Sequence, residues 1–342
     1  MIRILIVFFL SIALFAHEKH DSETGEDIFD QTDISAVLSM SALYRNVADN
    51  EYESLYVPGV EALEKTYNKN RGFNLNYLEI SLHTLLNNGV DLDGVIHVSE
   101  DTIEIGEAYF YKRLFKRIWI KGGKFRSSFG YINKFHHHRL YFTDYPLIFR
   151  AIFGSEGLSE KGLALSYNNE SIRLQTEILQ GENETSFGYG DASLFVLSLK
   201  YRLGESLKTG LSWARGRNSL GEASQIYNYF VKLSHGFYDF TNNITLEYFK
   251  KNEPANLEGF YAQTVLKRNG WGLGYKEEAI LKSGEFNDLK ARSFLLIYEM
   301  EEFARIALEY RVDDSLYLDG ERKRVKEAIL QINIPLGVHH HQ

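Results

Sequence analysis

The chain of 342 residues has no cysteine and only four prolines. Without cysteine, no disulfide can hold it together as one of the small cross-linked domains common among exported proteins. After its first sixteen residues, the sequence also has no apolar run near the roughly 20 residues that a membrane-spanning helix needs. These absences exclude a disulfide-stabilised domain and a bundle of membrane-spanning helices.

Basic residues are fewer than acidic ones, with 38 Lys and Arg against 46 Asp and Glu, and they form no basic block. Nucleic-acid binding needs clustered Lys and Arg, so no nucleic-acid partner is expected. The sequence has no G-x-S-x-G nucleophile motif. Gly270, Gly272 and Gly274 alternate within a predicted strand and do not form a phosphate-binding loop. We therefore expect no enzyme and assign no catalytic residue.

The first sixteen residues predict a secretory signal peptide. Arg3 supplies the positive start, and an apolar run from Ile4 to Ala16 follows, broken only by Ser11. Residues 17–33 are acidic and polar without periodicity, which is typical of a flexible segment. We expect cleavage after Ala16, export, and a periplasmic leader over 17–33.

From residue 34 onward, apolar residues alternate with polar ones, and 22 tyrosines and 23 phenylalanines favour strands. Successive side chains of a strand point to opposite faces, so this alternation gives each strand one apolar and one polar face. The clearest example is the segment 195–203, in which one face carries Phe195, Leu197, Leu199, Tyr201 and Leu203. The other face carries Val196, Ser198, Lys200 and Arg202.

Sixteen segments fit this pattern, and most can cross a bilayer as tilted strands of about 9–11 residues. They are 34–46, 70–86, 90–100, 102–114, 117–130, 161–170, 172–183, 193–204, 207–218, 226–237, 240–252, 257–269, 271–281, 288–301, 302–316 and 325–337. The predicted barrel thus spans 34–337. Residues 338–342 form a His-containing tail that we expect in the periplasm.

The predicted connections alternate in length. Those after even-numbered strands are short, as at 87–89, 115–116, 205–206 and 238–239. Most of the others are longer and polar: 47–69, 131–160, 184–192, 219–225, 282–287 and 317–324. Short periplasmic turns and longer outer loops are typical of outer-membrane barrels.

A soluble β-sandwich would also show alternation. Its packed core could not hold the unpaired Arg, Lys and Glu of the polar face, whereas a water-filled lumen can. The sequence therefore predicts an all-β protein, a transmembrane antiparallel barrel of about sixteen strands in the bacterial outer membrane.

The polar face of the strands predicts the wall of the pore. Its expected pore-lining residues are Arg173, Lys200, Arg202, Glu309 and Arg311, with Glu177, Lys232, Glu247, Lys267 and Arg305 on the same face. An anion-specific pore should show rings of Arg or Lys. None stands out in the sequence, so we interpret these charges as a solvated wall.

The connection at 131–160, after the fifth strand, is the most distinctive stretch. In sixteen-stranded general porins the loop at this position folds into the barrel, and we expect the same here. Imidazole and carboxylate groups suit Zn²⁺ or another divalent transition ion, so His136, His138 and Asp144 are candidate metal ligands. In an extended segment His137 would point the other way. The alternative is a histidine run that packs as an ordinary polar loop, so Zn²⁺ is a candidate cofactor and none is required.

Residues 122–167 resemble a bacterial family of porin-like proteins often labelled zinc-regulated outer-membrane receptors and distantly related to phosphate-selective porins. The match comprises a Gly-[RK]-Phe-x-Ser-x-Phe-Gly opening at 123–130, then Asn133, His136, His138, Asp144, Pro146, Leu147 and the segment 150–154. A Trp-Asp pair typical of that family is replaced by Leu140 and Tyr141. The resemblance implies an outer-membrane location and divalent-metal handling.

We therefore expect a porin-type channel for small hydrophilic solutes or ions, linked to divalent-metal uptake. The alternatives are a non-conducting metal-binding protein and a structural or adhesive barrel. Expected partners are the lipids of the outer membrane, small solutes or metal ions, and further copies of the chain in a homotrimer. A gated receptor would need about 22 strands and a plug, and sixteen strands use up this chain.

Overall fold

The computed structural model describes residues 32–60, 67–86, 89–252, 256–300 and 303–337. The predicted signal peptide, almost all of the predicted leader and the His-containing tail lie outside the described residues. Within them, the first strand begins at Thr32, two residues earlier than the sequence predicted.

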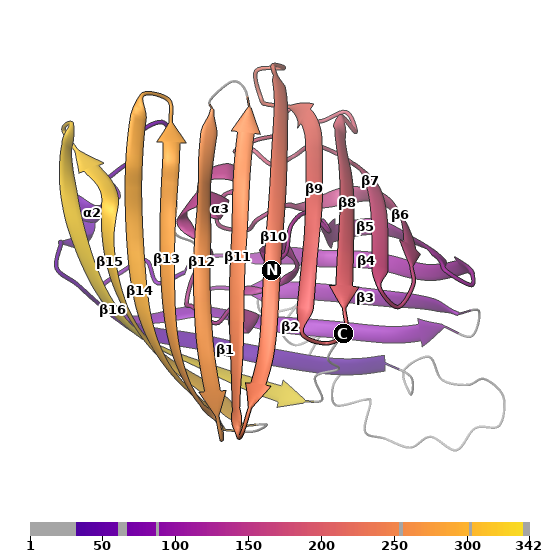
Figure 1. Cartoon of the computed structure of the whole chain (residues 1–342), viewed down its shortest axis with the longest axis horizontal. Coiled ribbons are helices and arrows are strands. Elements are labelled where there is room, and N and C mark those ends of the chain that lie inside the picture. The colour runs from indigo at the N-terminus through magenta and orange to yellow at the C-terminus, as the bar shows by residue number, and fades with distance from the viewer. Residues whose placement is uncertain (1–31, 61–66, 87–88, 253–255, 301–302, 338–342) are drawn as a thin grey trace.

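The chain forms one closed antiparallel barrel of sixteen strands, as predicted (Figure 1). The strands are β1 (Thr32–Arg45), β2 (Gly72–Leu86), β3 (Val90–Val98), β4 (Ile103–Phe115), β5 (Ile118–Arg126), β6 (Ser159–Asn168), β7 (Ile172–Leu179), β8 (Leu194–Leu203), β9 (Leu207–Arg217), β10 (Ala223–Phe237), β11 (Phe240–Asn252), β12 (Leu257–Arg268), β13 (Trp271–Ser283), β14 (Phe286–Met300), β15 (Ala304–Leu318) and β16 (Glu321–Gly337).

The first and last strands close the barrel. β1 pairs with β16 over eleven residues, from Ser35 opposite Gly337 to Arg45 opposite Glu327. Each strand therefore has a hydrogen-bonded neighbour on both sides. Closure leaves no sheet edge exposed to lipid, where unpaired backbone groups cost several kcal/mol each.

Short helical segments lie in the connections. They are α2 (Asp49–Glu53), η2 (Ile132–Lys134), η3 (His137–Arg139) and α3 (Leu147–Phe153). In the part of the chain that the structure describes, no helix has the length and apolar character needed to cross a membrane.

The connections alternate between short and long as predicted, except at two places. Every connection after an even-numbered strand has two or three residues, as predicted. The expected polar loops 282–287 and 317–324 are instead mostly strand, because β13 and β14 extend toward a turn at 284–285, and β15 and β16 toward one at 319–320. Extending the strands gives these polar residues ladder hydrogen bonds that a loop could not supply.

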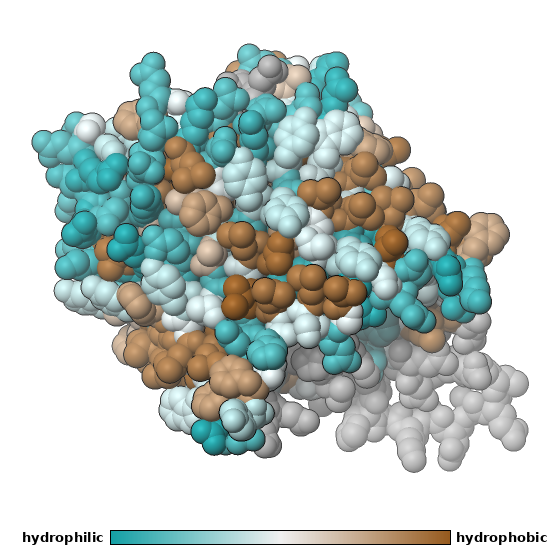
Figure 2. Space-filling view, in the orientation of Figure 1, coloured by the Kyte–Doolittle hydropathy of each residue, from teal (hydrophilic) through white to brown (hydrophobic). Residues whose placement is uncertain are grey.

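The outer face is apolar, and the register of β8 is the predicted one. Leu199 is 44% exposed, whereas its neighbour Ser198 is 1% exposed on the inner side. Phe195 and Leu197 share the outer face with Leu199. Figure 2 shows apolar and aromatic side chains across the middle of the strands that face the viewer, as the surface of a lipid-embedded barrel requires.

The interior is more filled than a simple aqueous channel. The connection from β5 to β6, residues 127–158, folds into the barrel and carries α3 against the inner side of β11, β12 and β13 (Figure 1). Its side chains form an apolar core with inward residues of the wall, among them Val196, Ala214, Ile226 and Phe249. The expected inward fold of this loop is confirmed, and a large part of the lumen is occupied by packed side chains.

Candidate functional site: the loop inside the barrel

Buried carboxylates of the wall hold the inner loop in place. Glu247 of β11 is fully buried and accepts the backbone N–H groups of Tyr131 (2.7 Å) and Ile132 (3.2 Å). It also accepts the Tyr261 hydroxyl (2.7 Å) and the Asn228 amide (2.9 Å). Four donors on one carboxylate compensate the cost of burying its charge, and they fix where the loop begins.

Two further wall carboxylates act in the same way. Glu309 of β15 accepts the Thr143 backbone N–H at 2.7 Å and its hydroxyl at 2.8 Å. Glu177 of β7 accepts the Ser127 hydroxyl at 2.5 Å and the Ser128 N–H at 2.7 Å. The loop is therefore fastened to three separate parts of the wall.

Asn133 joins the two ends of the loop. Its amide nitrogen donates to the carbonyl oxygens of Ser127 (2.8 Å) and Leu158 (2.9 Å), and its oxygen accepts the Leu158 N–H at 2.8 Å. The side chain is fully buried, so these bonds are shielded from water. Asn133 thus makes the loop a closed unit that can be held rigidly inside the barrel.

Helix α3 adds apolar packing to this polar frame. All seven of its side chains are buried, and Phe149 meets Phe249 of β11 with ring centroids 6.0 Å apart. Gly259 of β12 gives the helix room, since a Cβ there would lie 3.0 Å from Ile148 Cδ1. Each large apolar side chain buried in this way contributes roughly 1.5–3 kcal/mol.

A group of histidines and carboxylates lies where the loop meets β2, β3 and β4. Oxygen Oε2 of Glu79 is 3.1 Å from His97 Nε2, 3.3 Å from His136 Nδ1 and 3.4 Å from His138 Nδ1. One ligand atom from each of Glu79, His97 and His136 falls within 4.8 Å of the other two. Imidazole nitrogen and carboxylate oxygen are ligands for divalent transition ions, so this group can chelate such an ion.

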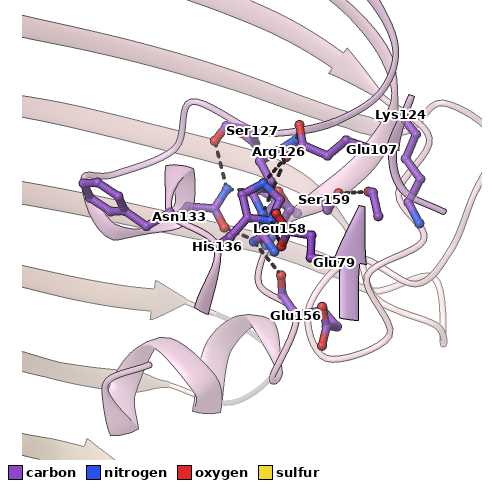
Figure 3. Close-up of polar contacts among 12 residues, drawn as sticks. Glu79, Glu107, Lys124, Arg126, Ser127, Asn133, His136, Glu156, Leu158 and Ser159 are labelled. Atoms are coloured by element: carbon purple, nitrogen blue, oxygen red, sulfur yellow. Dashed lines mark hydrogen bonds and ion pairs between the residues drawn. The ribbon is translucent and has the colours of Figure 1, made fainter. Parts of the chain in front are cut away.

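Glu107 and Arg126 complete the surroundings of His136 (Figure 3). His136 Nε2 lies 2.8 Å from Glu107 Oε1. Arg126 Nε lies 3.7 Å from Glu107 Oε1, and its Nη1 donates to the Tyr145 hydroxyl and the Glu156 carbonyl oxygen. His136 thus has a carboxylate on each side, with a guanidinium nearby.

The three loop histidines have different electrostatic surroundings. Burial lowers the pKa of His136, but Glu79 and Glu107 outweigh burial and raise it to about 9. Burial, reinforced by Arg126, holds the pKa of His137 well below its ordinary value. Burial also lowers the pKa of His138, although Glu79 opposes the shift. His136 is therefore the histidine whose charge is most strongly favoured by the wall.

The structure brings two of the three predicted metal ligands together and leaves the third apart. His136 and His138 both lie beside Glu79, although residues 137–139 form a 3₁₀ turn and not the expected extended segment. His137 points elsewhere, as expected, and packs between Tyr67 and Tyr145.

Asp144, the third predicted ligand, does not lie with the other two. Its Oδ2 pairs with Arg150 Nη1 at 3.1 Å, and its Oδ1 is 3.9 Å from His137 Nε2. Asp144 therefore lies with Arg150 and His137 and is not part of the group around Glu79. The guanidinium on α3 is a stronger partner for this carboxylate than a neutral imidazole.

Sequence reasoning missed Glu79, His97 and Glu107. A usable signal existed, because the short turn at 87–89 fixes the hairpin register and places Glu79 directly opposite His97. Bulges obscured it: the register of β2 shifts against β1 at Ser39/Met40, and that of β4 shifts against β3 at Val95/Ile96. An extra residue breaks the period of two.

Two neighbouring cavities of about 240 and 330 Å³ lie between the loop and the wall and share Tyr131, Lys134 and Lys208. Basic side chains line them: Lys134, Arg139, Arg173, Lys200, Arg202, Lys208 and Lys232. The carboxylates among the described lining residues are Asp144 and Glu170. The enclosed position of Lys134 and the charges of Lys208 and Lys232 lower its pKa to about 8. The fold thus gathers positive charge that is scattered in the sequence.

The expected pore-lining residues separate into two groups. Arg173, Lys200 and Arg202 line the larger cavity. Glu309 and Arg311 also point inward but are buried, Glu309 under Thr143 and Arg311 in an ion pair with Glu278 (2.7 Å). The inward direction was read correctly from alternation, but these two side chains fasten the interior and do not face an open lumen.

By sequence, the chain is similar to a protein of a bacterium. An uncharacterised protein of Aquifex aeolicus is 31% identical, over 90% of this chain and 78% of its own length. No protein-family model matches the chain.

Solved structures of similar fold are outer-membrane porins and channels. The anion-selective porin of Comamonas acidovorans superposes with a TM-score of 0.61 at 11% identity, over 89% of this chain and 99% of its own. The channel DcaP of Acinetobacter baumannii gives 0.59 at 13% identity, over 89% and 97%. OprD of Pseudomonas aeruginosa gives 0.53 at 10% identity, over 91% and 96%.

Proposed function

We propose that this chain is a channel for small hydrophilic solutes or ions. It belongs to the same family as the Aquifex aeolicus protein, and it is a bacterial outer-membrane barrel of porin fold. The observation that carries the proposal is the inner loop. It is fastened to the wall by Glu177, Glu247 and Glu309, and it leaves cavities lined by charged side chains beside it. This arrangement supports a pore that the loop constricts.

The charge of the cavities supports a preference for anions. Seven Lys and Arg side chains against two carboxylates make a positive potential between loop and wall, which concentrates anions and repels cations. The Comamonas porin of similar fold is anion-selective. We therefore propose small anions as the preferred solutes and assign no catalytic residue.

Purified protein in planar bilayers tests the proposal. We expect steady conductance and a reversal potential in a salt gradient that indicates anion preference. The double variant Lys200→Glu with Lys232→Glu should lose that preference, because it exchanges two cavity cations for anions. Lys250→Glu, an exposed position of β11, is the matched control and should keep it. No conductance from correctly folded barrels would rule out the channel.

A second candidate function is favoured by the group of Glu79, His97 and His136. In this alternative the barrel handles divalent metal, as a zinc-linked uptake channel or as a non-conducting metal-binding protein. Conductance distinguishes these two, and metal binding distinguishes both from a purely structural or adhesive barrel. The homotrimer stays a prediction, which cross-linking in intact membranes would check.

A further inference from the structure

We propose that Glu79, His97 and His136 form a binding site for one divalent transition-metal ion, which ties the inner loop to the barrel wall. Glu79 and His97 come from the adjacent wall strands β2 and β3, and His136 comes from the loop. An ion bound by all three would link segments far apart in sequence. This inference rests on the metal-handling function proposed as the second candidate and names the residues that would bind the ion. It holds whether or not the barrel conducts.

The separations of the ligand atoms fit an ion. Zn²⁺ binds nitrogen and oxygen at about 2.0–2.1 Å, so the ligand atoms of a tetrahedral site lie about 3.3–3.4 Å apart. Glu79 Oε2 is 3.1 Å from His97 Nε2 and 3.3 Å from His136 Nδ1. Small side-chain movements suffice to place these three atoms around one ion.

The state of His136 Nδ1 is a second, independent observation. This atom is buried, and within the described ranges it makes no hydrogen bond, although it lies 3.3 Å from Glu79 Oε2. A buried nitrogen without such a bond is costly, and a metal ion accepting its lone pair removes that cost. Two atoms that bind the same ion lie close to each other without forming a hydrogen bond, as His136 Nδ1 and Glu79 Oε2 do.

Glu107 supports the same assignment from the other side of the ring. Its Oε1 is 2.8 Å from His136 Nε2, so once a metal ion replaces the Nδ1 proton, the imidazole donates its remaining proton to Glu107 and directs the Nδ1 lone pair at the ion. A histidine that binds a metal usually donates its other ring N–H to a carboxylate, which fixes the orientation of the ring. Glu107 is therefore a positioning residue and not a ligand.

Space and charge also agree with a bound ion. Gly106 leaves room for the His97 ring, since a Cβ there would lie 3.0 Å from His97 Cε1. Glu79 and Glu107 bring two negative charges into a buried region that has Arg126 beside it. Arg126 offsets one of these charges, and a divalent cation offsets the other. His138, whose Nδ1 is 3.4 Å from Glu79 Oε2, is the nearest further nitrogen donor.

The ligand chemistry selects the class of ion. Two imidazoles and one carboxylate match Zn²⁺ and its neighbours Co²⁺, Ni²⁺ and Cu²⁺, whereas Ca²⁺ and Mg²⁺ prefer oxygen ligands throughout. Three protein ligands leave a fourth position for His138 or for water.

The test uses the full chain with His17, His20, His339, His340 and His341 replaced by serine, because terminal histidines could bind metal on their own. Calorimetry with Zn²⁺ should give one site per chain, and Co²⁺ should give the visible absorption of a tetrahedral site. His136→Ala and His97→Ala should each weaken binding about 100-fold or more, because loss of a residue that only orients a ligand typically costs about 10–100-fold. Glu107→Gln should fall in that smaller range.

His235→Ala is the matched control, since His235 is an exposed histidine at the end of β10 and should leave binding unchanged. Each variant is first shown to form a heat-modifiable barrel, so that loss of the site is separated from loss of the fold. A folded parent that binds no Zn²⁺, or a His136→Ala variant that binds like the parent, would overturn the proposal. Conductance is measured separately, so either result leaves the channel proposal to its own test.

Discussion

Single side chains in this barrel have roles set by the face on which they lie. Leu199 and Lys200 are adjacent in β8, yet Leu199 points to the lipid and Lys200 lines a cavity of the interior. Inward residues that carry the same charge also differ in their roles. Lys200 faces a cavity, whereas Arg311 is buried in an ion pair with Glu278. Position on the wall therefore decides whether a charge is hydrated or structural.

The first prediction at this scale compares Leu199→Arg with Lys200→Glu. An arginine at the bilayer midplane of a barrel costs about 2–4 kcal/mol, while a charge on the inner face stays hydrated. We expect Leu199→Arg to reduce the yield of heat-modifiable barrel on gels and Lys200→Glu to assemble normally. Equal yields from the two variants would show that the assigned faces of β8 are wrong.

At the scale of elements, the connection from β5 to β6 is the part that gives the barrel its character. Its polar contacts include buried carboxylates of β7, β11 and β15, and α3 supplies much of its apolar packing. Three carboxylates on separate strands hold the loop as one rigid body, because each fixes a different segment of it. Release of one contact should therefore loosen the loop without opening the barrel.

The prediction for this element is the variant Glu247→Ala. It leaves the N–H groups of Tyr131 and Ile132 and the hydroxyl of Tyr261 without their acceptor, at a cost of about 1–3 kcal/mol for each buried group. We expect an assembled barrel with a mobile loop, seen as larger and noisier conductance and faster tryptic cleavage after Lys134.

The control for this variant is Glu321→Ala, which removes an exposed carboxylate at the turn between β15 and β16. It should behave like the parent. Conductance and cleavage of Glu247→Ala that match the control would show that Glu247 does not hold the loop.

The whole molecule depends on closure between β1 and β16. At one end of this seam, Arg45 of β1 and Glu327 of β16 face each other with Nε and Oε1 2.9 Å apart, and both are buried. Removing one partner of a buried ion pair typically costs about 3–5 kcal/mol, because the other charge stays buried. Arg45 also pairs with Asp49 at 3.2 Å, which reduces the loss here. The seam joins the two ends of the described chain, so its loss affects the entire ring.

We therefore predict that Glu327→Ala lowers the temperature at which the barrel unfolds in SDS, as followed by its gel mobility. Glu327→Gln should have a smaller effect, because an amide oxygen can still accept a hydrogen bond from Arg45. Asp314→Ala, which breaks the exposed pair of Asp314 with Arg324, serves as the control and should change little. An unchanged unfolding temperature for Glu327→Ala would mean that the seam does not limit stability.

The sequence by itself determined the strands and their faces. Alternation is a local property of extended backbone, so residues such as Leu199 and Ser198 could be assigned to opposite faces without any knowledge of neighbours. The short connections predicted which strands form hairpins, although the pairing of Glu79 with His97 was not recognised from them. A count of about sixteen strands followed, and with it the barrel.

Only the tertiary structure decided what the inward charges do. Alternation places Glu247, Glu309 and Lys200 on the same face, and nothing local distinguishes a loop anchor from a cavity wall. That distinction depends on where the inner loop lies, which is set by contacts across more than 100 residues. For the same reason the sequence paired His136 with nearby Asp144, whereas the inward fold of the loop brings His136 to Glu79 and His97. The loop and these wall strands meet only when the loop lies inside the barrel, and the alternation of residues along the chain does not encode that contact.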